Sequence, residues 1–197
     1  MTTAAPRASV LRGPAIPLSR TTLALHWAVA AAVLGMLAYG YWIQTLPSAQ
    51  GRTADVQIHK SLGVLVFVLA LARLLWRARE GFPPPAGPHG RAERRAALGL
   101  HLFLIAATLL MPLSGIGRSL AYARPVSVFG WPLIPRLFED RQETLYAVSA
   151  TLHDGLALVL SAGILVHVGA ALKHHYLDRD DTLRRMTGRG MTGEGGR

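Results

Sequence analysis

The sequence predicts an all-α membrane protein, a bundle of four transmembrane helices with both termini in the cytoplasm. Hydrophobic residues make up 51% of the 197 residues, whereas charged residues make up only 16%. The charges gather between four long apolar stretches, as in a chain that crosses a bilayer several times. We therefore expect a cytoplasmic N-terminal tail over 1–20, one membrane domain over 21–177 and a cytoplasmic C-terminal tail over 178–197.

The first two apolar stretches are long enough to cross a membrane, which takes about 20 residues. The first runs from Leu23 to Ile43 and ends in aromatic residues. This end favours a retained span with an interfacial aromatic belt over a cleaved signal peptide. We expect a short polar turn over Pro47–Gln57 and the second span over Ile58–Trp76.

The second half of the chain repeats this alternation of spans and polar segments. A proline-rich linker over Gly81–Gly90 leads to a third span at about Ala97–Gly117. A longer loop over Arg118–Glu143 follows, with room for a short interfacial helix. The fourth span lies within Thr144–Tyr176, where the run Gly155–Leu172 is interrupted only by one serine and one histidine.

The distribution of Lys and Arg indicates the orientation. Of the 21 basic residues, 15 lie in the N-terminal tail and in the segments 73–96 and 173–197, which places these segments in the cytoplasm. The formal net charge of +10 could suggest a nucleic-acid ligand, but no recognition motif accompanies it. We therefore expect contact with membrane lipid and no binding to nucleic acid.

Four histidines of the predicted spans form two pairs at two depths. His153 and His167 are 14 residues apart on the fourth span, so at about 100° per residue they share one face. At about 1.5 Å per residue they lie roughly 21 Å apart along the helix. His26 begins the first span at the depth of His167, and His59 begins the second span at the depth of His153. Ionisable groups in a span usually face the bundle interior.

Each pair suits the two axial positions of a haem iron. With imidazole at both positions the iron has no free site for oxygen, so such a centre passes electrons. A zinc or copper site fits less well, because two ligands per ion are too few without cysteine or carboxylate. The chain has no cysteine, which excludes disulfides, cysteine-ligated iron–sulfur clusters and covalent attachment of a c-type haem. A single histidine near a helix end is more often an ordinary interfacial residue; the matched depths favour ligands here.

The chain also resembles a known family, the bacterial cytochrome b561 family, from about Leu18 to Thr187. The resemblance is carried by R-x-x-x-x-x-H-W at Arg20–Trp27, H-x-x-x-G at His59–Gly63, H-x13-H at His153–His167 and A-A-L-K-H-H-Y-L-D-R-D-D-T-L-R-R-M at Ala170–Met186. The last element is the most specific of the four. The longer N-terminal tail and the glycine-rich C-terminal extension of this chain depart from the family pattern.

The resemblance implies a multi-pass protein of the bacterial inner membrane that holds two non-covalent b haems. His26 and His167 would bind the inner haem iron, and His59 and His153 the outer haem iron. Ubiquinone is implied as the electron acceptor. Characterised members of the family include the di-haem superoxide oxidases.

Further residues are candidates for contacts around the cofactors. Gly63, four residues after His59, would let a porphyrin approach the helix backbone. Arg73 could pair with a propionate of the inner haem, or extend to the headgroups as an ordinary interfacial arginine. His101 has no obvious partner and could contact a propionate or quinone, or simply lie at the interface. His174 could be an alternative inner ligand, a quinone contact or an interfacial histidine.

Two basic residues of the outer loops are candidates for guiding a substrate. Lys60 and Arg124 could steer a small anion such as superoxide toward the outer haem. Ordinary loop charge with local salt bridges is the alternative for both.

The sequence thus favours a di-haem b cytochrome with superoxide:quinone oxidoreductase activity. Electrons would enter at the outer haem, cross to the inner haem and reduce ubiquinone. The alternative is a cytochrome b subunit that anchors a separate dehydrogenase or hydrogenase and receives electrons from this redox protein partner. A haem-free transporter or structural protein is a third possibility.

Overall fold

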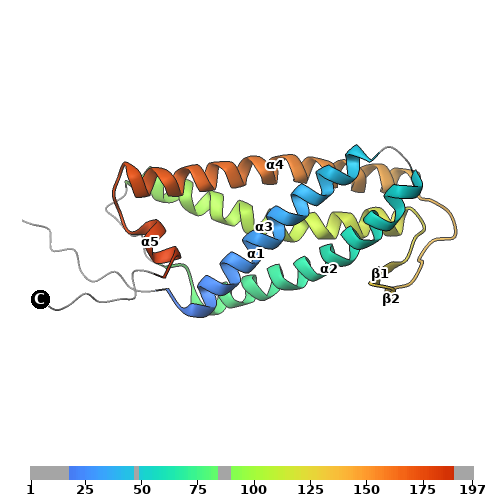
Figure 1. The fold of residues 1–197 in the computed structure, drawn as a ribbon, viewed down its shortest axis with the longest axis horizontal. Coiled ribbons are helices and arrows are strands. Elements are labelled where there is room, and N and C mark those ends of the chain that lie inside the picture. Colours follow the sequence, from blue (N-terminus) through green and yellow to red (C-terminus); the bar gives the residue numbers. More distant parts are fainter. Residues whose placement is uncertain (1–17, 47–48, 84–89, 189–197) are drawn as a thin grey trace, which may run out of the picture.

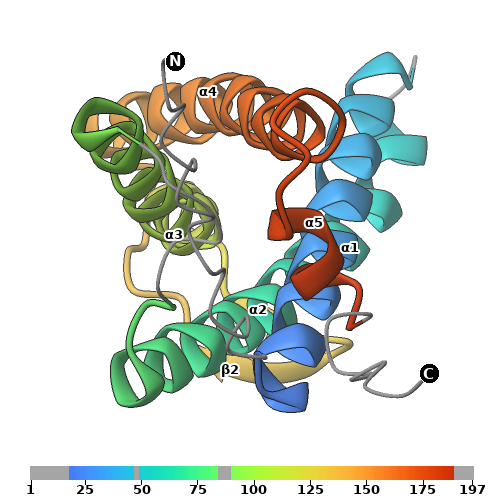
Figure 2. The ribbon, with the colours of Figure 1, turned by 90° about the vertical axis from the view of Figure 1, so that its left-hand side faces the viewer.

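The computed structural model describes residues 18–46, 49–83 and 90–188, and the side chains of this part except those of residues 49–51. Its elements follow in the order α1 (Arg20–Thr45), α2 (Ala49–Glu80), α3 (Arg91–Ala121), β1 (Val126–Val128), β2 (Trp131–Ile134), α4 (Glu143–Tyr176) and α5 (Thr182–Met186) (Figure 1). The long helices run up and down in a bundle, as Figure 2 shows along its length. The start of α1 and the end of α4 lie at one end of the bundle, the terminal end, and the two strands lie at the other, the hairpin end.

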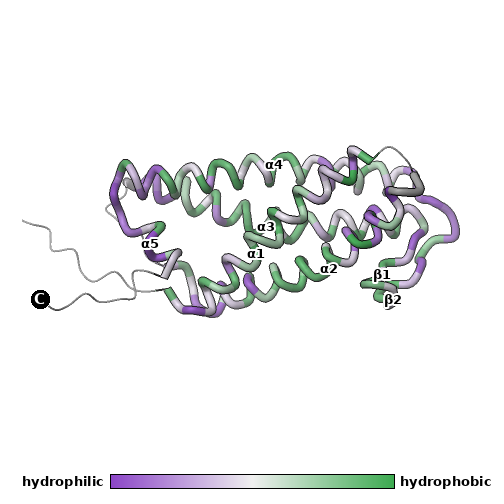
Figure 3. Tube along the Cα trace, in the orientation of Figure 1, coloured by the Kyte–Doolittle hydropathy of each residue, from purple (hydrophilic) through white to green (hydrophobic). Residues whose placement is uncertain are grey.

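Four helices of the described chain are long and apolar enough to cross a membrane. Only a small cluster packs in the middle of the bundle, with Val29, Val33, Ala107 and Leu160 at its centre. Many apolar side chains point outward instead; Leu158 is 68% exposed and Leu165 73% exposed. Apolar residues dominate the middle of the helices and polar residues their ends (Figure 3). This distribution suits helices surrounded by lipid and confirms the four-span helical bundle expected from the sequence.

The helices pack as two pairs joined along one side. The backbones of α1 and α2 lie close together. Those of α3 and α4 lie close together at more positions, and α2 lies against α3. Within the described residues, α4 meets α1 mainly through side chains, as in the 3.5 Å contact between the hydroxyls of Tyr41 and Ser161. Groups that link α4 to α1 or α2 therefore matter for closing the bundle.

One expectation about a connecting segment is wrong, and one helix extends beyond its expected span. The polar turn expected over Pro47–Gln57 is mostly helix, because α2 already begins at Ala49. Ala49, Arg52 and Ala54 are good helix formers, so the helix extends beyond the apolar run that the bilayer requires. The third span is also longer than expected, since α3 begins at Arg91 and ends at Ala121.

The loop after α3, which has room for a short interfacial helix, holds a β-hairpin instead. Val126 pairs with Ile134 and Val128 with Trp131 in an antiparallel ladder. Phe129 and Gly130 form the turn, with φ of 48° and 91°. Positive φ at both central residues is the geometry of the tightest hairpin turns, and the flanking β-branched and aromatic residues favour strands.

The chain folds back on itself at the terminal end. The indole N–H of Trp27 donates to the carbonyl of Met186 at 2.8 Å, which fixes α5 against α1. The side chain of Ser19 caps α1 by accepting from the N–H of Thr22 at 3.1 Å. The segment expected as a C-terminal tail thus has an ordered beginning up to Gly188, whereas its remainder and residues 1–17 of the N-terminal tail lie outside the described residues.

Candidate functional site: two histidine pairs

The hairpin-end pair consists of His59 on α2 and His153 on α4. Their ring centroids are 6.2 Å apart, with the two planes at 81°. Both side chains are half-buried and enter the space between the helices. The helical periodicity of α4 thus brings His153 to the histidine expected at its depth.

The terminal-end pair consists of His26 on α1 and His167 on α4. Its ring centroids are 6.3 Å apart, with the planes at 55°. Two imidazoles that bind one metal from opposite sides have centres about 6 Å apart, because each metal–nitrogen bond is about 2 Å long and the ring centre lies about 1 Å further. Both pairs have the separation that a bis-imidazole metal centre requires.

Hydrogen bonds of His153 place its proton on Nδ1 and leave the lone pair on Nε2. Its Nδ1 lies 3.2 Å from the carbonyl oxygen of Met111 and 3.0 Å from the hydroxyl of Ser114. A carbonyl can only accept, so Nδ1 carries the proton and donates it. The lone pair of the neutral ring is then on Nε2, as in ligands whose other ring nitrogen donates to the protein. Ser114 itself donates to the Met111 carbonyl at 2.7 Å.

His59 is held by packing instead of hydrogen bonding. Its Nδ1 is buried and has no hydrogen-bond partner within the described part of the chain. The ring of Tyr39 lies 6.0 Å from it between centroids. The hydroxyl of Tyr39 donates to the carboxylate of Asp55 at 2.9 Å and so is directed away from the imidazole.

Each histidine of the hairpin-end pair lies against a glycine of the neighbouring helix. A Cβ atom at Gly40 would be 3.2 Å from Cε1 of His59, and one at Gly115 would be 3.1 Å from Cε1 of His153. Both distances are tighter than ordinary van der Waals contact, so the missing side chains allow the close approach. Gly63, predicted to let a porphyrin approach the helix backbone, lines the same cavity, where its Cβ would meet Met36 at an ordinary 3.8 Å.

A cavity of about 590 Å³ adjoins the hairpin-end pair. This volume is within the range of about 300–1,000 Å³ typical of pockets for cofactors and other small molecules. Its lining includes both histidines and the glycines Gly40, Gly63 and Gly115. The basic residues that line it are Arg52, Lys60, Arg118 and Arg124.

The terminal-end pair has two further cationic or basic neighbours. The guanidinium of Arg73 donates to Nδ1 of His26 at 3.2 Å, so this nitrogen accepts. Metal binding at Nε2 of His26 therefore requires its proton to move to Nδ1 and Arg73 to turn away. His101, which had no obvious partner in the sequence, lies 5.3 Å from His167 between ring centroids. Its Nδ1–H donates to the carbonyl of Ala97 at 2.7 Å, because a carbonyl can only accept.

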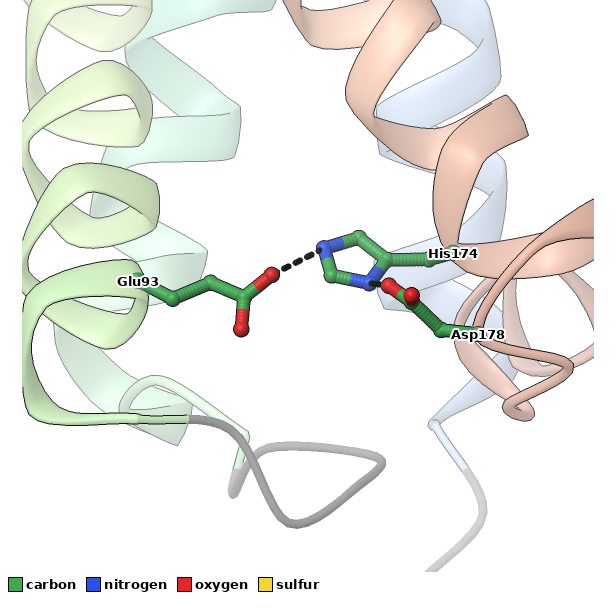
Figure 4. A group of neighbouring side chains, drawn as sticks. All are labelled: Glu93, His174 and Asp178. Atoms are coloured by element: carbon green, nitrogen blue, oxygen red, sulfur yellow. Dashed lines mark ion pairs between the residues drawn. The ribbon is translucent and has the colours of Figure 1, made fainter.

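His174 lies in a charged cluster with the carboxylates of Glu93 and Asp178 (Figure 4). Its Nδ1 is 2.8 Å from Asp178 and its Nε2 is 3.9 Å from Glu93. The ammonium of Lys173 contacts the same two carboxylates, at 3.0 and 2.7 Å. These three groups have the composition of a metal site, but Lys173 already supplies the positive charge between the acids. His174 is thus engaged with carboxylates, including that of Asp180 at 3.4 Å from Nδ1.

Sequence reasoning did not identify Gly40, Ser114, Gly115 or Tyr39. The sequence does carry a partial signal, since Gly40 and Gly115 each lie near the hairpin-side end of a span, as His59 and His153 do. Which glycine meets which histidine depends on how the helices pack, and this is not visible in the spacing.

Four helices long enough to cross a membrane, with two histidine pairs between them at two depths, define the class of a membrane haem protein. The comparison with known proteins agrees, because residues 18–189 match the prokaryotic cytochrome b561 family. The chain therefore belongs to that family, which makes it a bacterial multi-pass membrane protein that binds haem b and transfers electrons.

Three relatives illustrate this membership. "Cytochrome b561 homolog 2" of Escherichia coli (strain K12) is 36% identical over 173 residues, which is 87% of this chain and 92% of that protein. "Cytochrome b561 homolog 1" of the same organism is 29% identical over 173 residues, covering 85% and 95%. "Probable superoxide oxidase CybB" of Yersinia pestis is 32% identical over 130 residues, covering 66% and 72%.

Proposed function

We propose that this protein oxidises superoxide at the hairpin end of the bundle and delivers the electrons to ubiquinone. Two superoxide anions would each lose one electron, and one quinone would take up two electrons and two protons to form a quinol. We expect the hairpin end to face outward and both termini to lie in the cytoplasm of a bacterial inner membrane. The name of the relative from Yersinia pestis supports the choice of superoxide.

The observation that carries this proposal is the pair of bis-histidine sites stacked along α4. Haem b bound there would carry single electrons between iron(II) and iron(III). His59 with His153, and His26 with His167, would hold two such groups one above the other. The protein's own task is to fix the imidazoles, to exclude water with the surrounding apolar helices and to place charges at the entrance.

Lys60 and Arg124 are the best candidates for attracting the anion. Both line the cavity of the hairpin-end pair, and Lys60 donates to the carbonyl of Pro125 at 3.2 Å. Among the described residues neither contacts a carboxylate. By contrast, Arg118 pairs with Asp154 at 3.1 Å, and Arg141 pairs with Glu143 at 3.0 Å. Uncompensated cations at a cavity attract small anions and raise their rate of arrival.

The terminal end offers contacts for the second haem and the quinone. Once released from His26, Arg73 could bind a haem propionate, since a guanidinium pairs with a carboxylate through two hydrogen bonds. His101, close to His167, and His174, between two carboxylates, remain candidates for contact with quinone or propionate.

The first test is the haem content of the purified protein, measured by a reduced-minus-oxidised spectrum. We expect two b haems per chain in the wild type and one in each of the variants His59→Ala and His167→Ala. A wild type that folds without haem would refute the whole proposal. Equal haem content in all three proteins would show that these histidines are not ligands.

The second test measures quinone reduction driven by superoxide. We expect Lys60→Gln and Arg124→Gln to lower the rate at limiting superoxide, and added salt to reduce this difference because it screens the charges. Arg136→Gln is the matched control, because Arg136 lies at the same end, donates to the carbonyl of Phe138 and does not line the cavity. A full haem complement with no superoxide-dependent quinone reduction would exclude the activity.

One feature favours the alternative of an electron-transfer subunit. The hairpin carries large apolar side chains that face outward, with Trp131 79% exposed and Phe129 59% exposed. Such a surface can anchor in the membrane interface or bind a redox protein partner. Copurification of a dehydrogenase or hydrogenase that is lost in Trp131→Ser, together with no reaction toward superoxide, would favour this alternative.

A further inference from the structure

The two histidines of the hairpin-end pair differ in how their second ring nitrogen is satisfied. Nδ1 of His153 donates to the Met111 carbonyl and lies beside the Ser114 hydroxyl. Nδ1 of His59 is buried, so water cannot reach it, and it has no partner among the described residues. A buried polar atom without a partner is uncommon and costs free energy, which makes it a feature to explain.

From this difference we infer that His59 donates less electron density to the iron than His153 does. We infer that Gly40 maintains this difference, because it offers no hydrogen-bond acceptor to Nδ1 of His59. The inference rests on the proposed role of His59 and His153 as ligands of the outer haem. A ligating imidazole normally donates its other N–H to an oxygen, which makes the ring a more basic ligand. Without that hydrogen bond, His59 would stabilise the iron(III) form less, and the reduction potential of the outer haem would be higher.

The surroundings of His59 show why no acceptor reaches its Nδ1. A Cβ atom at Gly40 would be 3.9 Å from Nδ1, so a short polar side chain at this position could reach it. Glycine supplies no such group. The hydroxyl of Tyr39, whose ring packs beside the imidazole, is directed to the carboxylate of Asp55 instead. On the other side of the cavity, the Met111 carbonyl accepts from Nδ1 of His153 and the Ser114 hydroxyl lies beside it, whereas position 40 offers His59 no acceptor.

This asymmetry has a consequence for electron transfer in the proposed direction. A higher potential at the outer haem makes it a better acceptor for an electron from outside. Gly40 is thus a positioning residue with two effects: it admits the imidazole of His59 and leaves its N–H without a partner.

The test compares Gly40→Ser with Gly40→Ala in the full-length protein. Both variants add the same Cβ beside the imidazole, and only serine adds an acceptor for Nδ1–H. We expect the midpoint potential of the outer haem to be lower in Gly40→Ser than in Gly40→Ala, and the potential of the inner haem to be equal in both. Two haems per chain with identical outer potentials in the two variants, or a higher potential with serine, would overturn the inference while leaving the proposed function intact.

A measurement on the wild type keeps the inference testable if Gly40→Ser loses haem. The exchangeable Nδ1 protons of the oxidised outer haem can be resolved by electron–nuclear double resonance, and Ser114→Ala identifies the signal of His153. We expect two unequal protons, one of them hydrogen-bonded. Two equivalent hydrogen-bonded protons would refute the inference, and a wild type without haem would refute it together with the proposed function.

Discussion

Replacing Gly115 by alanine should specifically weaken the outer haem site proposed at the hairpin-end pair. The new Cβ would lie 3.1 Å from Cε1 and 3.3 Å from Nδ1 of His153, whereas ordinary contacts begin at 3.4 Å. The imidazole must therefore move by a few tenths of an ångström, away from the Met111 carbonyl to which it donates. Changes to groups that orient a ligating histidine typically cost 10–100-fold in affinity. This corresponds to about 1.4–2.8 kcal/mol.

The assay is the rate at which the outer haem passes to an excess of a haem-scavenging protein, with the haem-to-protein ratio as a second readout. Gly99→Ala is the matched control, because it adds the same methyl group to α3 with nothing within 4 Å of the new Cβ. We expect Gly99→Ala to keep both haems as the wild type does. The reasoning is refuted if Gly115→Ala retains the outer haem as tightly as Gly99→Ala does.

Three further changes have outcomes that the structure determines. Arg73→Gln removes the cation beside His26 and should lower the reduction potential of the inner haem, because a nearby positive charge favours the reduced form. The control is Arg79→Gln, since Arg79 is exposed; it should leave both potentials unchanged in a redox titration. Gly163→Ala would place a Cβ 2.5 Å from the ring of Phe103 and overpack the contact between α3 and α4. Thermal denaturation should then show a loss of stability of about 1–3 kcal/mol. Gly169→Ala is the control, because its new Cβ would have no neighbouring atom within 4 Å. The hydrogen bond from Lys173 holds the pKa of Asp178 below its usual value of 3.8, so the stability it contributes is complete above that pH and is lost as the pH falls further. The difference in stability between the wild type and Asp178→Asn should accordingly shrink in acid, and a difference that grew in acid would contradict this account.

The sequence was sufficient for the features that depend on one helix at a time. Length and apolarity predict the spans, and the helical period predicts that His153 and His167 share a face. Matched depths then suggest their partners, and the structure places His26 and His59 about 6 Å from them. Depth can be inferred because helices of similar length cross the same bilayer.

The features that depend on contact between helices could not be predicted in this way. Gly40 and Gly115 are two glycines among 20, and only packing shows that they face the imidazoles. The sequence shows no partner for His101, near the start of the expected third span; in the structure α3 starts at Arg91, so this residue lies nearly three turns inside the helix and close to His167. The hairpin depends on the turn at Phe129 and Gly130, which apolar periodicity does not reveal.

The packing of the helices gives the proposed cofactors a structural role as well. The backbones of α1 and α2, of α2 and α3, and of α3 and α4 lie close together, whereas both histidine pairs connect α4 with α1 or α2. A metal bound between the imidazoles would therefore close the open side of the bundle. Removal of haem should loosen α4 relative to α1 without unfolding either helix, because each keeps its own backbone hydrogen bonds in the membrane. Spin labels at the lipid-facing positions Leu34 and Leu165 would report this as a broader distance distribution in the haem-free protein, with unchanged helix content by circular dichroism. An equally narrow distribution with and without haem would mean that side-chain packing alone holds α4 in place.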